Sequence, residues 1–403
     1  MRKIFFAIFT LICYLSFAQK NESLAKTPPM GWNSWNTFET KIDEELIKGV
    51  VDAFLKDGLK DAGYTYIVLD DGWMAMERDA QGNLVPDPKK FPNGLKHLSD
   101  YIHSKGLKFG IYNCAGDKTC GGYPGSHGHE SQDALMYASW GVDFLKYDWC
   151  NTQNLNTEVA YKTMSSAIMA TGRPMIFSLC EWGNSSPWTW AEKIGHLWRT
   201  TGDIYPCFDC EVNHGTWTSW GVMKIVNMRA DIRKYAGPGH WNDPDMMEVG
   251  NGMSFAEDRA HFALWCMMAA PLIMGNDVRK SSKETLSILT NKELIAIDQD
   301  SLGIQAFRVS KKDSLEVWAK PLVNKEWAIC FLNTSKKAQN LNFNWLANPI
   351  VDSVFDYSLN MTGTIFTVKD LYNNLQLTPT KKPLQTVIGA HDVLVVRLAK
   401  KKD

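Results

Sequence analysis

Short apolar runs alternate with helical stretches along residues 25–277. Eight of these runs end in polar or aromatic residues, at 30–35, 64–71, 108–114, 141–148, 175–180, 197–203, 240–246 and 272–277. Between the first two runs, apolar residues recur at helical spacing over 43–62, where Asp43 takes a cap position and Gly63 a terminating one. Eight strands alternating with helices predict an α/β fold, a (β/α)8 TIM barrel. A doubly wound open sheet is the alternative, although no GxGxxG motif follows an early strand.

The pattern changes after about residue 303. Four segments, DSLEVWAKPL, KEWAICFLN, GTIFTVKDL and HDVLVVRLAKK, alternate apolar with polar residues, and turn residues separate them. They predict a small antiparallel β-sandwich domain with a structural or accessory role. The expected organisation is therefore a catalytic barrel over 19–302 and a sandwich over 303–403.

The first 18 residues have the pattern of a secretory signal peptide. Arg2 and Lys3 precede an apolar run too short for a stable membrane span, and the small residues Ser16 and Ala18 end it. Cleavage after Ala18 predicts an exported protein, periplasmic or secreted, that does not stay attached to a membrane. Export also permits disulfides among the remaining cysteines.

Composition narrows the classes of partner and cofactor. The chain of 403 residues is 45% hydrophobic and has a formal net charge of −1. A charge near zero argues against nucleic acid as a partner, because phosphate binding needs a concentrated basic surface. Cys207 and Cys210 have a CxxC spacing but no second pair, and no HExxH occurs, so neither a metal nor another cofactor is predicted.

Carboxylates gather at the predicted strand ends, where the active sites of barrels form. Any one of them can be explained as a helix cap or an ion-pair partner. Bringing all of them together at one end of a barrel costs charge repulsion and desolvation. Carboxylates beside tryptophans and without a metal are typical of glycoside hydrolysis, in which one acid attacks the anomeric carbon and another protonates the leaving oxygen. The strand-end acids are Asp70, Asp71, Asp148, Asp203, Asp243, Asp245 and Asp277.

The segment GVDFLKYDWC places a cation beside one of these acids. Lys146 and Asp148 are two residues apart at the end of an apolar strand, so the period of two points both side chains to one face. A structural ion pair is one interpretation. Under the hydrolase interpretation Asp148 is the nucleophile, and Lys146 keeps it ionised and contacts a sugar hydroxyl.

Seven segments, spread over much of the barrel region, resemble the signatures of glycoside hydrolase family 27. In chain order they are TPPMGWNSWN, LDDGW, KTCGGYPGSHGHE, LKYDWC, SLCEWG, WRTTGDI and GPGHWNDPDMMEVGN. The likeness is greatest to the plant and microbial α-galactosidases of that family. It implies a barrel followed by a sandwich, and exo-acting, retaining hydrolysis of terminal α-galactosyl residues without a metal cofactor. It leaves open whether the substrate is an oligosaccharide, a galactomannan or a glycoconjugate.

The resemblance also implies roles for individual residues. Asp148 corresponds to the nucleophile and Asp203 to the acid/base, and Cys120 is expected to form a disulfide with Cys150. The remaining implied contacts are with the sugar: Trp35 near C6, Asp70 and Asp71 on the O4 and O6 side, Tyr112 beside the nucleophile, Lys146, Arg199 and Asp245 on the other hydroxyls, Met246 packing near them, and Cys180 and Trp182 beside the 2-position.

Two departures and three alternatives accompany the resemblance. Gly72 stands where the family often has a cysteine, and Trp149 where a small or polar residue is usual, which affects the rim of the site. The same family includes α-N-acetylgalactosaminidases and β-L-arabinopyranosidases. Cys180 and Trp182 favour a hydroxyl at the 2-position, and the presence of both Asp70 and Asp71 favours galactose. An inactive galactose-binding barrel is disfavoured because Asp148 and Asp203 are both present.

Overall fold

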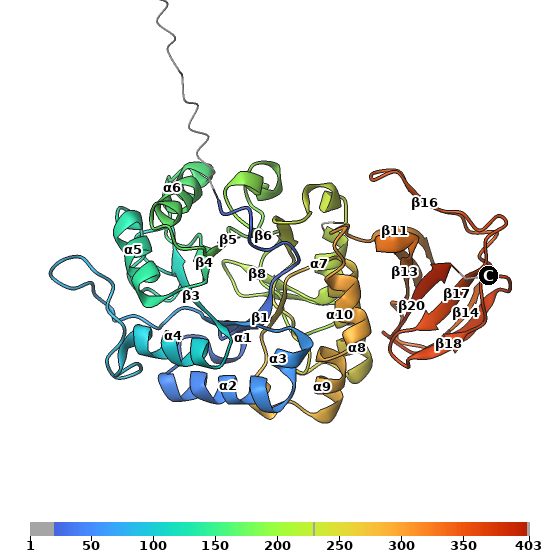
Figure 1. Ribbon diagram of the computed structural model, residues 1–403, viewed down its shortest axis with the longest axis horizontal. Helices are drawn as coiled ribbons and strands as arrows, with labels where there is room; N and C mark the ends of the chain where they lie inside the picture. The colour runs from blue at the N-terminus through green and yellow to red at the C-terminus, as the bar shows by residue number, and fades with distance from the viewer. Residues whose placement is uncertain (1–19, 229, 401–403) are drawn as a thin grey trace, which may run out of the picture.

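The computed structural model describes residues 20–228 and 230–400 (Figure 1). The predicted signal peptide, residues 1–18, lies outside the described residues. Eight parallel strands form one curled sheet in the order β10-β1-β2-β3-β4-β5-β6-β9, and each lies within a predicted run. The strands are β1 (Met30–Asn33), β2 (Tyr66–Leu69), β3 (Lys108–Cys114), β4 (Phe144–Asp148), β5 (Ile176–Cys180), β6 (Leu197–Arg199), β9 (Trp241–Asp243) and β10 (Leu272–Met274).

The sheet closes on itself into a barrel. Met247, just beyond β9, forms a parallel bridge with Met274 of β10. Helices surround the strands, as Figure 1 shows. They are α1 (Trp35–Phe38), α2 (Glu44–Lys56), α3 (Leu59–Ala62), α4 (Gly94–Ser104), α5 (Glu130–Trp140), α6 (Thr157–Ala170), α7 (Val222–Met228), α8 (Phe255–Met267), α9 (Lys283–Leu289) and α10 (Lys292–Asp298). Short 3-10 turns lie at η1 (Pro187–Thr189), η2 (Ala191–Lys193), η3 (Ile232–Tyr235), η4 (Val278–Lys280) and η5 (Val323–Lys325).

The single helix expected over 43–62 is broken into α2 and α3. Asp43 is the cap, as predicted, because its carboxylate accepts a hydrogen bond from Leu46 N at 2.8 Å. Gly58 lies between the two helices with a φ of 75°, a left-handed conformation that ends α2. Gly63, also left-handed, ends α3 as expected.

The C-terminal region is an antiparallel sandwich, as predicted. Its main sheet has the order β11-β12-β13-β20-β17-β18, and two two-stranded sheets, β14-β19 and β15-β16, cover one face of it. The strands are β11 (Phe307–Lys312), β12 (Leu315–Pro321), β13 (Trp327–Asn333), β14 (Gln339–Phe343), β15 (Ile350–Asp352), β16 (Tyr357–Leu359), β17 (Phe366–Asp370), β18 (Leu375–Leu377), β19 (Leu384–Ile388) and β20 (Val393–Lys400).

Strand β13 does not alternate as the sequence argument expected, because both of its faces are buried. Trp327, Ile329 and Phe331 belong to the core of the sandwich. Cys330 and Leu332 point to the other face and join the core of the barrel, where α8 packs against β12, β13 and β20. The sandwich is thus attached to the barrel through a continuous apolar layer, beside α8 and α10 in Figure 1.

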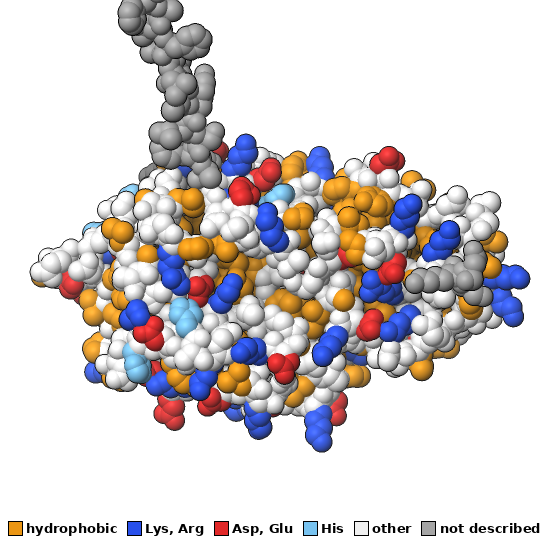
Figure 2. Space-filling model, in the orientation of Figure 1, with side chains coloured by type: hydrophobic (Ala, Val, Ile, Leu, Met, Phe, Trp, Pro, Cys, Tyr) orange, Lys and Arg blue, Asp and Glu red, His pale blue; other side chains and the backbone are white. Residues whose placement is uncertain are grey.

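Acidic and basic side chains intermingle on the face of the molecule shown in Figure 2. This mixture agrees with the formal net charge of −1. No helix within 20–228 and 230–400 combines the length and the apolar character needed to cross a membrane.

Candidate active site

The register of β3, β4 and β5 stacks their inward side chains in two layers. Lys146 lies between Tyr112 and Ser178, and Asp148 lies one layer higher, beside Cys180. Phe144 and Lys146 line a cavity inside the barrel. The Asp148 carboxylate interacts with the charges of Lys146, Asp203 and Asp70, so it faces the barrel interior too. The shared face predicted for Lys146 and Asp148 is confirmed.

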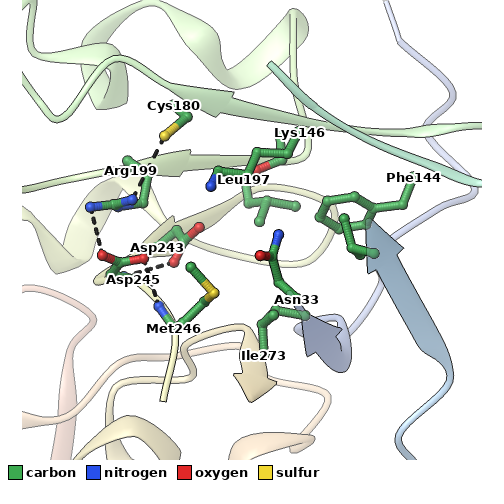
Figure 3. A pocket seen from close by; sticks show the side chains of 12 residues that line it. Asn33, Phe144, Lys146, Cys180, Leu197, Arg199, Asp243, Asp245, Met246 and Ile273 are labelled. Atoms are coloured by element: carbon green, nitrogen blue, oxygen red, sulfur yellow. Dashed lines mark hydrogen bonds and ion pairs between the residues drawn. The ribbon is translucent and has the colours of Figure 1, made fainter. Parts of the chain in front are cut away.

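The cavity has an apolar floor and a charged wall (Figure 3). Val68, Phe144 and Leu197 each stand two residues before a charged residue, Asp70, Lys146 and Arg199 respectively, and so lie one layer deeper in the barrel. With Ile273 they form the floor. Five of the residues implied by the resemblance lie in its wall: Lys146, Cys180, Arg199, Asp245 and Met246. A closed floor and a polar wall suit a pocket that takes the end of a sugar chain rather than its middle.

Lys146 forms its ion pair with Asp70 rather than with Asp148. Its ammonium lies 2.7 Å from Asp70 Oδ2, which also accepts a hydrogen bond from Asn33 Nδ2 at 2.8 Å. The long lysine side chain passes over the ring of Tyr112, with 5.3 Å from Nζ to the ring centre, and so reaches β2 from β4. The ion pair places Lys146 beside Asp70, whereas the resemblance grouped it with Arg199 and Asp245. The hydroxyl that Lys146 contacts stays a prediction. Burial by itself lowers the pKa of Lys146, but the Asp70 and Asp148 carboxylates hold that pKa above its usual value.

Asp148 is a buried carboxylate, with 6% of its surface exposed. Burial raises its pKa to about 7, against the opposing effects of Lys146 and of the backbone N–H of Trp149, which donates to Oδ1 at 2.8 Å. The charges of Asp203 and Asp70 raise the pKa further. The cation therefore does not hold Asp148 fully ionised, because burial has the larger effect.

Arg199 joins the two carboxylates on the opposite wall. Its guanidinium lies 3.0 Å from Asp203 Oδ1 and 2.8 Å from Asp245 Oδ2, and Nη1 donates to Cys180 Sγ at 3.7 Å. The Asp203 side chain keeps 38% of its surface exposed, whereas that of Asp245 keeps 4%. Asp203 is thus the carboxylate that solvent or a leaving group can reach from outside.

Asp245 is held in a strained backbone conformation. Its φ is 94°, in the left-handed region that residues other than glycine rarely adopt. Its carboxylate accepts hydrogen bonds from Met246 N at 2.8 Å and from Ile204 N at 2.9 Å, and its own N–H donates to Asp243 Oδ1 at 2.9 Å. Burial raises the pKa of Asp245 to about 6, although Arg199 opposes the shift. Strain fixed by local hydrogen bonds is typical of a functional position.

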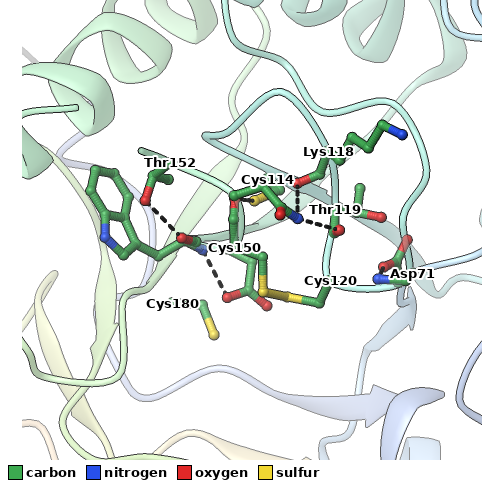
Figure 4. Close-up of a disulfide and its surroundings, with 12 residues drawn as sticks. Asp71, Cys114, Lys118, Thr119, Cys120, Cys150, Thr152 and Cys180 are labelled. Atoms are coloured by element: carbon green, nitrogen blue, oxygen red, sulfur yellow. Dashed lines mark hydrogen bonds between the residues drawn. A yellow bond between two sulfur atoms is a disulfide. The ribbon is translucent and has the colours of Figure 1, made fainter. Parts of the chain in front are cut away.

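The predicted disulfide between Cys120 and Cys150 is present (Figure 4). It ties the loop after β3 to the end of β4, and a carboxylate oxygen of Asp148 lies within 4.8 Å of both sulfur atoms. Tyr112 Oη donates to Cys120 Sγ at 3.2 Å. Because both sulfurs are oxidised, this group offers no pair of thiolates to a metal.

The same loop positions Asp71. Gly121 N donates to Asp71 Oδ2 at 2.7 Å, and Gly72 N donates to Oδ1 at 2.9 Å. Burial raises the pKa of Asp71 to about 6. Gly72 has a φ of 90°, and a Cβ there would lie 2.7 Å from Thr40 Cβ. This backbone does not admit the cysteine that the family often has at that position unless Thr40 moves.

Three tryptophans lie apart from the cavity wall. Trp35 begins α1 and is half-buried, and its backbone N–H donates to Asn33 Oδ1 at 2.9 Å. Trp182 is half-buried in the loop after β5, in a left-handed conformation with a φ of 59°. Trp149 stacks on Tyr161 of α6, with ring centres 5.6 Å apart, so it packs against the helix layer. Any effect of Trp149 on the rim of the site therefore acts through its packing on α6.

Comparison with known proteins agrees with this geometry. Residues 27–300 match the family model for alpha galactosidase A, and residues 312–398 match the model for the alpha galactosidase C-terminal beta sandwich domain. The chain belongs to the α-galactosidase (melibiase) family, glycoside hydrolase family 27. The protein is therefore an α-galactosidase, which is a glycoside hydrolase.

Individual members of family 27 are similar over nearly the whole chain. Alpha-galactosidase A of Cellvibrio japonicus is 53% identical over 96% of this chain and 96% of its own length. Alpha-galactosidase 2 of Arabidopsis thaliana is 44% identical over 95% and 92%. The structure of alpha-galactosidase I from Mortierella vinacea has a TM-score of 0.87 at 38% identity, covering 94% of this chain and 98% of that one. The structure of the Saccharomyces cerevisiae enzyme with raffinose has the same TM-score at 32% identity, covering 94% and 99%.

Sequence reasoning missed two polar groups of this family 27 site. Asn33 lines the cavity and donates to Asp70, and its signal was its place two residues before Trp35 at the end of the first strand. Asp243 also lines the cavity and supports Asp245. It is one of the strand-end acids identified from the sequence. Its role becomes clear only from the turn in which its carboxylate accepts a hydrogen bond from the Asp245 N–H.

We predict that ionisation of Asp148 sets the acid limb of the activity profile. A nucleophilic carboxylate must be ionised, so kcat/KM should fall about tenfold per pH unit below a pKa of about 7. Because the negative charge of Asp203 contributes to that raised value, Asp203→Asn should shift the limb to lower pH. The profile is measured with an aryl α-galactoside whose leaving group needs no proton. A limb that stays in place in the variant would contradict this assignment.

The same shift has a consequence for stability. Asp148 has a pKa of about 7 in the folded protein, against an ordinary value of 3.8, so the folded protein binds this proton more tightly than the unfolded chain. The resulting stabilisation is present below a pH of 3.8 and is lost as the pH rises through about 7. Asp148→Asn should flatten this part of the pH dependence in denaturant titrations.

Proposed function

We propose that this enzyme removes terminal α-D-galactosyl residues by double displacement with retention of configuration. The observation that supports this most is the pairing of a buried carboxylate, Asp148, with a more exposed one, Asp203, above a cavity closed at its floor. Two carboxylates in different environments suit one nucleophile and one acid/base. The closed floor supports exo action, because a sugar chain cannot continue past it.

In the first step Asp148 attacks the anomeric carbon from the side opposite the leaving group, and Asp203 gives its proton to the glycosidic oxygen. The product is a β-linked galactosyl-enzyme ester. In the second step Asp203 takes a proton from water, whose oxygen attacks the same carbon and expels the Asp148 carboxylate. Two inversions give α-galactose, and Asp203 ends the cycle protonated.

The neighbouring groups support this chemistry. Asp70, held by Lys146 and Asn33, offers a fixed charged cluster to hydroxyls on one side of the sugar. Arg199 and Asp245 offer a second cluster on the other side. Preorganised partners of this kind hold the ring in place and so lower the entropic part of the barrier.

The stereochemistry tests the proposal directly. Proton NMR during early turnover of an aryl α-galactoside should show α-galactose first, with the β anomer appearing later through mutarotation. An initial product of β configuration would mean inversion and would exclude a covalent intermediate on Asp148.

We propose a substrate class from the relatives. The yeast relative was solved with raffinose, and α-galactosides such as raffinose are proposed for this enzyme too. Two family alternatives, N-acetylgalactosaminides and β-L-arabinopyranosides, differ at the 2-position and at C6. The Cys180 thiol, buried in the cavity wall beside Arg199, leaves less room at that wall than a smaller side chain would.

We predict that enlarging this wall changes discrimination at the 2-position. The double variant Cys180→Ala/Trp182→Ala should raise kcat/KM for an aryl α-N-acetylgalactosaminide relative to the galactoside by about 10- to 200-fold, because relief of one clash is worth a few kcal/mol at most. The two single variants separate the wall residue Cys180 from Trp182 in the loop. Cys330→Ala, which removes a buried free thiol in the sandwich, is the matched control. An unchanged ratio would contradict the assignment of this wall.

Export is likewise a proposal. Its supports are the signal pattern of residues 1–18 and two disulfides, Cys120–Cys150 and Cys207–Cys210, which persist in oxidising compartments. The sequence alone left the state of Cys207 and Cys210 open. N-terminal sequencing of the protein from the periplasm or the medium should give a chain that starts at Gln19.

A further inference from the structure

A β-hairpin follows Asp203 in the chain, between β6 and α7. It consists of β7 (Glu211–Asn213) and β8 (Thr218–Trp220). Its last residue, Trp220, is tied to the proposed acid/base: Trp220 N donates to the Asp203 carbonyl at 2.9 Å, and Ile204 forms a parallel bridge with Trp220. Tyr205 N returns a hydrogen bond to the Trp220 carbonyl at 2.9 Å. The position of Trp220 is therefore fixed relative to Asp203.

The base of the hairpin is anchored independently. Cys207 and Cys210 form a disulfide within the segment that leads into β7. Val222 N donates to the Cys207 carbonyl at 3.0 Å, and Gly221 N donates to the Cys210 carbonyl at 2.9 Å. The start of α7 thus holds the same segment by hydrogen bonds. The hairpin is therefore rigid enough to position a side chain that contacts substrate.

The Trp220 indole lies against the backbone immediately before Asp203. A Cβ at Gly202 would lie 3.1 Å from Trp220 Nε1, which is closer than most side chains approach. The ring is half-buried, so part of its surface stays open. Asp203 is also open, with 38% of its side chain exposed, whereas Asp148 is buried.

We propose that Trp220 is a specificity-determining residue that contacts the first sugar of the leaving group. The inference rests on the proposed function, in which Asp203 protonates the glycosidic oxygen. That oxygen belongs to the leaving group, so the departing sugar lies on the Asp203 side of the cavity mouth. An indole held beside Asp203 offers an apolar face to the C–H face of a pyranose, and its N–H offers a hydrogen bond to a hydroxyl.

The second tryptophan of the hairpin, Trp217, provides an internal control. The Trp217 ring stacks on the His214 ring with centres 3.9 Å apart, and His214 Nε2 lies 2.8 Å from Ser219 Oγ. Ser219 and Trp220 are adjacent in β8, so their side chains point to opposite faces. Trp217, 50% exposed, therefore belongs to the face turned away from Trp220.

The test compares substrates whose leaving groups differ in size. The leaving group of α-galactosyl fluoride has no ring. The leaving group of melibiose is a monosaccharide, and that of raffinose is a disaccharide. Trp220→Ala should lower kcat/KM for melibiose and raffinose about tenfold, the scale of one lost aromatic contact, and should leave galactosyl fluoride unchanged. Trp220→Phe should restore part of the loss, and Trp217→Ala should behave as the wild type on all three substrates.

Two results would overturn the inference. Unchanged rates on melibiose and raffinose would mean that Trp220 does not meet the leaving group. Methyl α-galactoside separates the remaining case, because its leaving group needs a proton but has no ring. A loss on this substrate equal to that on melibiose would mean that Trp220 supports the position of Asp203 instead. Failure of the proposed function is distinguishable from both, because the wild-type enzyme would then release β-galactose first or leave galactosyl fluoride unhydrolysed.

Discussion

Asp148→Ala should abolish hydrolysis of good and poor substrates alike, by a factor on the order of 10⁵, the scale seen when a covalent nucleophile is removed. Four polar neighbours of Asp148 are already held by other partners. Tyr112 is committed to Cys120 Sγ and Lys146 to Asp70, and both Asp203 and Asp245 are paired with Arg199. Steady-state kcat/KM on a dinitrophenyl α-galactoside and on raffinose measures the loss.

The matched control is Asp277→Ala. Asp277 is also a strand-end acid, but it pairs locally with Arg279 at 2.8 Å and with Lys280 at 3.4 Å, so activity should change little. A 2-deoxy-2-fluoro or cyclitol reagent should label Asp148 in the wild-type enzyme. Added azide should rescue Asp148→Ala by attacking the α-galactoside from the vacated side, which gives a β-galactosyl azide. A label on Asp203 would overturn the assignment.

The barrel could be predicted because its strands are short apolar runs that end in polar residues. Residues 141–148 illustrate this: the strand β4 is buried on both sides, and its last inward residues carry the charge. Strand β13 shows the limit. Its pattern looked like that of a half-exposed strand, but contact with α8 buries the outer face, and no local signal encodes a neighbour that lies so far away in sequence.

The members of the site could be predicted better than their pairings. Period-two geometry placed Lys146 and Asp148 on one face, yet the partner of Lys146 is Asp70, on a strand two places away in the sheet. Such a pairing depends on side-chain reach across Tyr112, which a sequence does not reveal. The hairpin of β7 and β8 was also missed, because each of its strands has only three residues.

The electrostatics of the two proposed catalytic acids differ in a way that sequence could not supply. Each cation of the site is already paired, Lys146 with Asp70 and Arg199 with Asp245 and Asp203. Among the residues that the structure describes, the buried Asp148 has no ion-pair partner of its own, and burial therefore raises its pKa. A carboxylate that is weakly stabilised in the resting enzyme gains more by forming a covalent bond to the sugar.

The second large effect should distinguish the acid/base from the nucleophile. Asp203→Ala should lower kcat/KM on raffinose about 10²- to 10⁴-fold, the range for loss of a general acid. The same variant should keep kcat/KM on a dinitrophenyl α-galactoside close to the wild-type value, because dinitrophenolate leaves without a proton. Asp209→Ala, an exposed carboxylate in the same loop, is the control and should affect neither substrate.

The products of azide rescue then settle the two roles by stereochemistry. In Asp203→Ala the galactosyl ester on Asp148 still forms but is slowly hydrolysed, since no base activates water. Azide needs no base, so it should restore kcat and attack the β-linked ester from the α face, giving an α-galactosyl azide. The β azide expected from Asp148→Ala is its anomer, so NMR of the two products separates the roles. If the Asp203→Ala product is the β azide, or if this variant is equally impaired on raffinose and on the dinitrophenyl substrate, Asp203 is not the acid/base.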